Sequence, residues 1–144
     1  MLRRTLLRIW LVLALLVSAA AGEAPLPASK PAVKGAIVAV IEAQLTAFRA
    51  GDVAKAYGYA AAELRAQKPQ PAFAVIVEAS YPEIWRSERA EFGIVRDDGR
   101  RATVTVQVFG KESAAAYDYT LAKETDGWRI IGVLRHTPRK TGKA

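Results

Sequence analysis

The chain has one histidine and no cysteine among its 144 residues, so its candidates for acid–base chemistry are that histidine and its carboxylates. His136 is a candidate general base, and Glu78 and Glu88 are candidate acids or bases if they approach a substrate to within about 3 Å. Glu88 and His136 are predicted to share one face at the same end of a sheet. The alternative for His136 is a solvated strand end beside Pro138. We therefore assign no catalytic residue and keep these three as the acid–base alternatives.

Aromatic residues are the stronger candidates for ligand binding. Residues 81–86 combine two aromatic side chains, a proline and a cation, and predict an irregular loop that enters the sheet, where binding residues often lie. The candidates are the aromatic residues near a predicted cavity and the cation of this loop: Tyr57, Tyr81, Trp85, Arg86, Tyr117 and Tyr119. The alternative for the tyrosines is core packing with one satisfied hydroxyl each.

Metal, cofactor and nucleic-acid binding are not predicted. One histidine and no cysteine leave only oxygen ligands for a metal, and Asp97-Asp98-Gly99 is explained by turn chemistry. No phosphate-binding glycine loop is present, so we expect no cofactor. The formal charge is +7, but residues 36–134 hold 12 Lys and Arg against 13 Asp and Glu. The positive excess lies in the terminal segments, which argues against a nucleic-acid-binding face.

The elements that would position these residues begin with a sheet over 87–135. Turn signals at 97–99, 110–113 and 123–127 separate runs rich in β-branched and aromatic residues, and predict a meander of four antiparallel strands. A three-residue loop at 97–99, with Gly99 in the left-handed region, would pair Ile94 with Ala102 and Phe92 with Val104.

The same register, carried through a four-residue loop at 110–113, makes one face of the sheet apolar and aromatic. It pairs Val108, Val106, Val104 and Ala102 with Ala115, Tyr117, Tyr119 and Leu121, which in turn face Leu134, Gly132, Ile130 and Trp128. The opposite face carries Glu91, Gly93, Val95, Thr103, Thr105, Gln107, Asp118, Thr120, Arg129, Ile131 and Val133. The apolar face must be covered.

Three helices are predicted to cover it. Apolar residues at helical spacing predict helices over 36–50, 52–65 and 72–80, with Gly51 ending the first and Asp52 capping the second. Tyr81 precedes Pro82 and should leave helical geometry. The predicted fold class is α+β, with three N-terminal helices packed on one face of a curved four-stranded antiparallel meander.

The chain ends have compositions of their own. Residues 1–21 combine a basic start, a short apolar run and small residues, and predict a cleavable signal peptide, so we expect a periplasmic or secreted protein with no stable membrane span after cleavage. Residues 22–34 are predicted to be a Pro-rich linker, 35–136 a single α+β domain, with order beginning near Gly35, and 137–144 a basic tail.

The chain resembles a known superfamily in its helical and closing segments. A first helix ending in Gln44–Asp52, followed by Ala56-Tyr57 and closed by a strand with Gly127–Ile130, resembles the nuclear transport factor 2-like cone fold. More closely, 77–86 followed by Phe92-Gly93 and the Trp128 strand resembles a family of small, mostly bacterial proteins described only as a domain of unknown function. The similarity covers 37–134.

The resemblance implies a cone with helices on its inner face and leaves two functional classes open. Members of the superfamily include isomerases, dehydratases and hydrolases with Asp or His inside the cone, and also many non-catalytic proteins. The predicted inner face has neither residue in its central rows. We therefore expect a non-catalytic binding or accessory protein, with either a small cavity for an apolar ligand or a sheet face that binds a partner chain, and keep the enzyme as the alternative. Similar proteins often dimerise through the outer face, so we also expect a homodimer through Thr105, Ile131 and Val133.

Overall fold

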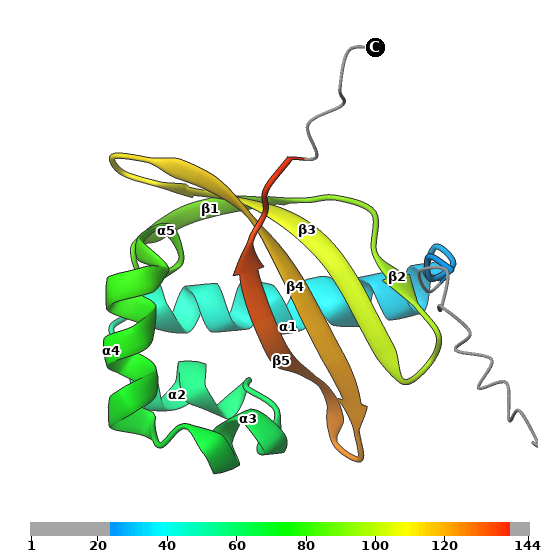
Figure 1. Ribbon diagram of the computed structural model, residues 1–144, viewed down its shortest axis with the longest axis horizontal. Helices are drawn as coiled ribbons and strands as arrows, with labels where there is room; N and C mark the ends of the chain where they lie inside the picture. Colours follow the sequence, from blue (N-terminus) through cyan, green and yellow to red (C-terminus); the bar gives the residue numbers. More distant parts are fainter. Residues whose placement is uncertain (1–23, 139–144) are drawn as a thin grey trace, which may run out of the picture.

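The structure is a computed structural model that describes residues 24–138, in which the helices precede the strands (Figure 1). The helices are α1 (Pro31–Arg49), α2 (Val53–Gly58), α3 (Ala62–Gln67), α4 (Gln70–Ser80) and α5 (Pro82–Trp85). The strands are β1 (Ser87–Phe92), β2 (Arg96–Asp97), β3 (Arg101–Gly110), β4 (Ala114–Glu124) and β5 (Gly127–Arg135). The predicted signal peptide and most of the basic tail lie outside the described residues.

The strands form one antiparallel sheet in the order β1-β3-β4-β5, and β2 pairs with β3 beyond the end of β1. In Figure 1, α1 crosses one face of the sheet, and α2, α3 and α4 lie together past the β5 edge. The predicted α+β arrangement with an antiparallel meander is confirmed. The predicted number of helices is wrong, because the described residues form five rather than three.

Helix α1 forms the main cover of the sheet. It starts at Pro31, where a proline fits the first helical turn, rather than at the predicted residue 36. Its apolar stripe, Ile37, Ile41, Leu45 and Phe48, is buried as predicted, and Gly51 ends the helix with φ +69°. Among the described helices, α1 alone is long and apolar enough to cross a membrane, a property that core helices and signal sequences share.

The predicted second helix is divided into α2 and α3 by the edge of the sheet. Asp52 caps α2 as predicted, accepting a hydrogen bond from the Lys55 amide at 3.0 Å. The helix stops because the Ile130 amide donates to the Tyr59 carbonyl at 2.9 Å and the Ala61 amide donates to the Ile130 carbonyl at 2.8 Å. These bonds pair part of the edge strand β5 with residues 59–61, which cannot then continue as a helix.

The turn before the sheet is more regular than predicted. Tyr81 leaves helical geometry, with φ −131° and ψ 56°, as expected for a residue before proline. Pro82 then opens the short helix α5, in place of the predicted irregular loop, because its fixed φ suits a first helical position. Helix α5 turns Glu83 and Ile84 inward, and both are buried.

The centre of the sheet has the predicted register. Val108, Val106, Val104 and Ala102 pair with Ala115, Tyr117, Tyr119 and Leu121. All eight side chains are buried, and they form the middle of the core against α1. The Gly110 amide donates to the Ser113 carbonyl at 2.9 Å and closes the predicted four-residue loop.

The predicted register of the first strand is wrong. Phe92 pairs with Val106, and an additional residue between β1 and β2 moves the pairing to Arg96 with Thr103. This bulge reverses the faces, so that Ile94 is 66% exposed and Val95 is 2% exposed. The turn itself lies at 98–101 rather than at 97–99, closed by a hydrogen bond of 3.1 Å from the Asp98 amide to the Arg101 carbonyl, with Gly99 at φ +88° as expected.

The predicted register of the last strand is wrong as well. Glu124 pairs with Gly127, so the turn between β4 and β5 is shorter than predicted. Lys123 therefore pairs with Trp128 and Leu121 with Ile130, and a bulge follows at Ile131, before Gly132 pairs with Thr120. The bulge places Val133 against the core and leaves Leu134 72% exposed, the reverse of the prediction.

The segment before α1 is held to the sheet. The Ser29 amide donates to the Val95 carbonyl at 2.8 Å, and the Asp97 amide donates to the Pro27 carbonyl at 3.1 Å. Arg96 also donates to the Leu26 carbonyl at 3.0 Å. Residues 26–29, which belong to the predicted linker, therefore cover the edge beside β2.

Candidate functional site

An apolar cleft of about 410 Å³ lies between α4 and the edge strand β5. Its volume is within the range of small-molecule sites. It is lined by Gln44, Phe48, Leu64, Lys68, Phe73, Ile76, Val77, Tyr81, Ile84, Asp118, Thr120, Ile130, Gly132, Val133 and Leu134. These residues come from both faces of the sheet, so the cleft passes the edge of β5 onto the outer face.

Aromatic packing builds the helical wall of this cleft. The rings of Phe48 and Phe73 stack with centroids 6.0 Å apart, Tyr57 packs on Phe73 at 5.2 Å, and Trp85 packs on Phe48 at 5.6 Å. The Tyr57 hydroxyl lies 2.6 Å from the Lys68 carbonyl oxygen, a hydrogen bond that holds the segment between α3 and α4. This wall is therefore fixed by contacts made without a ligand.

The β5 bulge opens the other wall. Gly132 lines the cleft, and a Cβ added there would meet nothing within 4 Å. Two exposed apolar side chains flank the opening, Leu134 from β5 and Ile76, 36% exposed, from α4. Exposed apolar groups beside an apolar cavity are typical of binding sites.

Gln44 is the buried polar side chain of the cleft. It projects from the apolar stripe of α1 and is 4% exposed. Its Nε2 donates to the Ala56 carbonyl of α2 at 3.1 Å. Tyr81, also in the lining, donates from its hydroxyl to the Val133 carbonyl at 2.8 Å and so joins α4 to β5.

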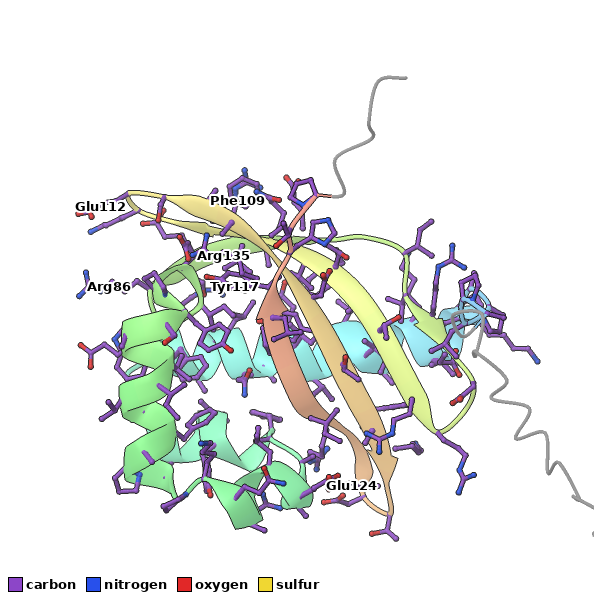
Figure 2. All side chains as sticks on the ribbon, viewed as in Figure 1. Arg86, Phe109, Glu112, Tyr117, Glu124 and Arg135 are labelled. Carbon is purple, nitrogen blue, oxygen red and sulfur yellow. The ribbon has the colours of Figure 1, made fainter. Side chains whose placement is uncertain are left out.

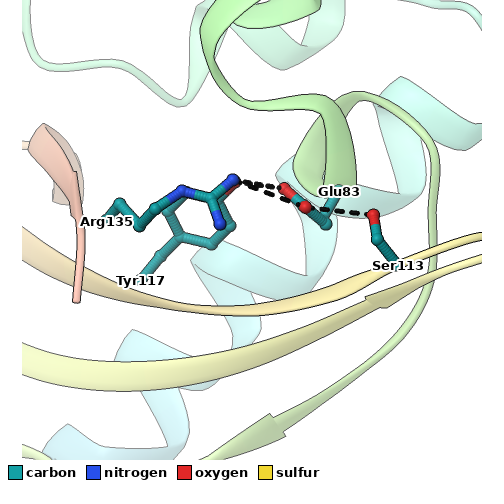
Figure 3. A network of polar contacts seen from close by, with 4 residues as sticks. All are labelled: Glu83, Ser113, Tyr117 and Arg135. Carbon is teal, nitrogen blue, oxygen red and sulfur yellow. Dashed lines mark hydrogen bonds and ion pairs between the residues drawn. The ribbon is translucent and has the colours of Figure 1, made fainter. Parts of the chain in front are cut away.

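A polar network beside the cleft joins α5, the β3–β4 loop, β4 and β5 (Figure 3). The buried carboxylate of Glu83 accepts from the Tyr117 hydroxyl at 2.5 Å and from the Ser113 hydroxyl at 3.0 Å. Arg135 pairs with the same carboxylate at 3.1 Å and donates to the Tyr117 oxygen at 3.2 Å. Figure 2 also places Tyr117 and Arg135 side by side. The network fixes the α5 turn to the sheet.

The protonation states of this network follow from its contacts. Burial alone raises the pKa of the Glu83 carboxyl, but the hydrogen bonds from Tyr117, its own backbone and Ser113, with the charge of Arg135, outweigh it and lower that pKa. Burial raises the pKa of the Tyr117 phenol, and the bond to Glu83 raises it further. Burial also raises the pKa of Tyr119. At neutral pH a neutral phenol therefore donates to an ionised carboxylate.

The outer face of the sheet holds a histidine–carboxylate pair. His136 Nδ1 lies 2.8 Å from Asp118 Oδ2, and Asp118 Oδ1 accepts from the Thr105 hydroxyl at 2.6 Å. This arrangement orients the ring and leaves Nε2 as a candidate base. Within residues 24–138, no hydrogen bond joins Nε2 to a hydroxyl that could act as a nucleophile. The prediction that His136 faces inward is wrong, because the β5 bulge turns it outward.

The acid–base candidates named from sequence do not come together. Glu78 is exposed on α4, and Glu88 is exposed at the start of β1, where a shift in register turns it away from the inner face. Among residues 24–138 no three His, Asp or Glu side chains are grouped to hold a metal ion.

The binding candidates divide among three places. Tyr81 lines the apolar cleft, while Tyr57 and Trp85 pack behind its wall. Trp85 and Arg86 line a second, more polar depression of about 710 Å³ beside the β3–β4 loop, and Figure 2 shows Arg86 at the same end of the molecule as Glu112. Tyr117 belongs to the Glu83 network, and Tyr119 is fully buried with no hydrogen-bond partner within 24–138.

Several residues of the site were not identified from sequence. Gln44 could have been, because it is a polar residue on the predicted apolar stripe of a helix, where a buried polar group needs a reason. Glu83 and Arg135 gave no such signal. Their meeting depends on the α5 turn and the β5 bulge, which local sequence patterns did not predict.

Comparisons with known proteins give a family and no activity. Residues 31–142 match the model of a family described as "Domain of unknown function (DUF4864)". No curated protein and no solved structure matches the chain significantly. The comparisons contain no match to the nuclear transport factor 2-like superfamily, so that resemblance remains a prediction.

Proposed function

The chain belongs to the DUF4864 family over residues 31–142, and on that premise we propose that the protein binds a small apolar ligand in the cleft between α4 and β5, without transforming it. The single observation that carries this proposal is the cleft itself, a cavity of about 410 Å³ with mostly apolar walls at the edge of the sheet. Burial of apolar ligand surface would supply the affinity.

Two features of the walls support binding over catalysis. The rings behind α4 and the Tyr81 bond to β5 hold the cleft open before a ligand arrives, which reduces the ordering cost of binding. The charged side chains in the lining are Lys68 and Asp118, and Asp118 is engaged by Thr105 and His136. The deep part of the cleft therefore favours a neutral guest.

We further propose that the protein acts in the periplasm or outside the cell. The basic and apolar composition of residues 1–21 supports this, and a chain without cysteine is compatible with an oxidising compartment. Mass spectrometry of the exported protein tests this proposal. We expect a new N-terminus created by cleavage of the signal peptide, and an uncleaved cytoplasmic product would contradict it.

Titration with the neutral fluorescent probe N-phenyl-1-naphthylamine tests the binding proposal. Ile76→Glu places a carboxylate at the cleft wall, and Val75→Glu places the same group one residue away on α4, where Val75 is 66% exposed and outside the lining. We expect Ile76→Glu to weaken binding about tenfold, because the lost apolar contact and the added charge together cost about 1.4 kcal/mol. Val75→Glu should bind as the wild type does. Equal loss in both variants, or no saturable binding by the wild type, would contradict the proposal.

A catalytic role remains the second candidate, favoured by one observation. Asp118 both lines the cleft and orients His136, so Nε2 of the histidine would face a substrate at the outer end of the cleft as a general base. Such an isomerase, dehydratase or hydrolase would lose its pH-dependent turnover in His136→Ala. If His136→Ala binds ligand as the wild type does and the wild type shows no turnover, the catalytic role is excluded and only the binding role remains.

A further inference from the structure

Gln44 is an amide whose orientation is fixed at the inner wall of the cleft. A side-chain amide has one donor end and one acceptor end, and the Ala56 carbonyl can accept only from the donor end. The bond of 3.1 Å from Nε2 to that carbonyl therefore directs Oε1 away from Ala56. Because Gln44 is only 4% exposed, its side chain cannot swing into solvent to find water without breaking this contact.

The acceptor end of Gln44 has no protein partner. Within residues 24–138, no hydrogen bond reaches Oε1. The fully enclosed side-chain oxygens without partners in this range are those of Ser29, Ser87 and Tyr119, and Gln44 Oε1 is not one of them. Gln44 is a lining residue, and we infer that the exposed part of Oε1 faces the cleft.

An amide oxygen in an apolar wall favours one kind of guest. An apolar molecule without a donor would displace water from Oε1 and leave that oxygen unsatisfied, whereas a guest with a hydroxyl or N–H would replace the lost bond. A cationic donor is disfavoured, because the carboxylate in the lining, Asp118, is already engaged by His136 and Thr105.

From this geometry we propose that the natural ligand is a neutral molecule with an apolar body and one hydrogen-bond donor, such as an alcohol or a phenol, and that Gln44 Oε1 accepts its hydrogen bond. This inference rests on the proposed binding function and adds the class of ligand to it. Gln44 is then the residue that distinguishes such a ligand from a hydrocarbon or an ether of the same shape.

Displacement of N-phenyl-1-naphthylamine by two matched compounds tests the inference. Decan-1-ol carries the donor, and its methyl ether keeps the oxygen and the chain without it. The ratio of their dissociation constants is measured in the wild type, in Gln44→Met and in Thr120→Val, which removes the hydroxyl of another lining residue. Comparing ratios between variants cancels the different hydrophobicity of the two compounds.

We expect the preference for the alcohol to fall about threefold to tenfold in Gln44→Met, the range for one neutral hydrogen bond, and to persist in Thr120→Val. A preference that survives Gln44→Met, or that disappears in Thr120→Val, would overturn the role of Gln44. If the role of Gln44 is overturned in this way but both compounds still bind saturably, the proposed binding function is retained. Failure of both to displace the probe would refute the binding function itself.

A second measurement does not depend on a variant, because Gln44→Met also loses the bond to Ala56 and could unfold. The measurement is ¹³C NMR of wild-type protein labelled at glutamine side chains. Decan-1-ol should shift the resonance of the Gln44 side-chain carbonyl carbon, Cδ, downfield, as a new hydrogen bond to Oε1 requires. Its methyl ether should leave that shift unchanged. An identical response to both compounds would contradict the inference.

Discussion

Two tyrosines on one strand should differ in how replacement by phenylalanine changes the free energy of unfolding. Tyr117 and Tyr119 are both fully buried on β4 and both point toward the core. The Tyr117 hydroxyl donates to the Glu83 carboxylate at 2.5 Å and accepts from Arg135 at 3.2 Å. The Tyr119 hydroxyl has no partner within residues 24–138. Replacement by phenylalanine keeps each ring and removes only the hydroxyl.

The magnitudes follow from these contacts. A hydrogen bond to a charged group contributes about 1.5–3 kcal/mol, so Tyr117→Phe should lower the free energy of unfolding by about 2 kcal/mol. Ser113 and Arg135 still bind the Glu83 carboxylate, which keeps the loss from being larger. A buried hydroxyl without a partner is unfavourable, so Tyr119→Phe should change the same quantity by zero to about +1 kcal/mol.

Urea denaturation followed by tryptophan fluorescence measures both variants at pH 7. For a domain of this size, Tyr117→Phe should also lower the Tm by roughly 8 °C, since 1 kcal/mol corresponds to roughly 4 °C. An equal loss in the two variants would refute the reasoning, because it would mean that the Tyr119 hydroxyl also makes a stabilising bond. An unaffected Tyr117→Phe would refute the role of the network.

Three further properties are expected, two from the Glu83 network and one from the outer face. The folded-state pKa of Glu83 is lowered, so its contribution to the free energy of unfolding is complete above its unfolded value of about 4.5 and is lost as the pH falls through the folded value. Chemical denaturation between pH 3 and 7 should therefore show stability that decreases toward low pH. Glu83→Gln should reduce this pH dependence and be less stable than the wild type at pH 7. The folded-state pKa of Tyr117 is raised, so its contribution to the free energy of unfolding is complete below its unfolded value of about 10 and is lost as the pH rises above it. The stability of Tyr117→Phe should fall less steeply with alkaline pH, and identical slopes in the wild type and the variant would contradict this. We propose that two copies of the chain pair through the outer face of the sheet, which carries Thr105 and Ile131 but not Val133, because Val133 packs inward. Light scattering at tens of micromolar should give a dimer mass for the wild type and a monomer mass for Ile131→Glu. A monomeric wild type would contradict the proposal.

The parts of the fold that could be predicted from sequence are those fixed by local patterns. The β3–β4 pairing was predicted residue by residue, because both strands alternate strictly and Gly110 and Ser113 bound a loop of one length. The α1 stripe and the Asp52 cap followed from periodicity and capping chemistry in the same way.

What could not be predicted depends on tertiary contacts. A bulge adds one residue to one strand. Gly93 and Gly132 lie beside the two bulges and are a local signal for them, but the predicted registers treated both as ordinary strand positions, so Ile94, Leu134 and His136 were placed on the wrong face. The break between α2 and α3 comes from pairing with Ile130, about 70 residues further on. The candidate site was affected most, because both the cleft and the Glu83 network are built at these irregular positions.

Native mass spectrometry of the wild-type protein, purified without detergent and then extracted under denaturing conditions, tests the central claim most directly. We expect one small apolar molecule bound reproducibly to each chain, released on denaturation, retained by Val75→Glu and present at clearly lower occupancy in Ile76→Glu prepared in parallel. An empty wild-type protein, or a molecule that Ile76→Glu retains equally, would contradict the claim that the cleft between α4 and β5 is a binding site.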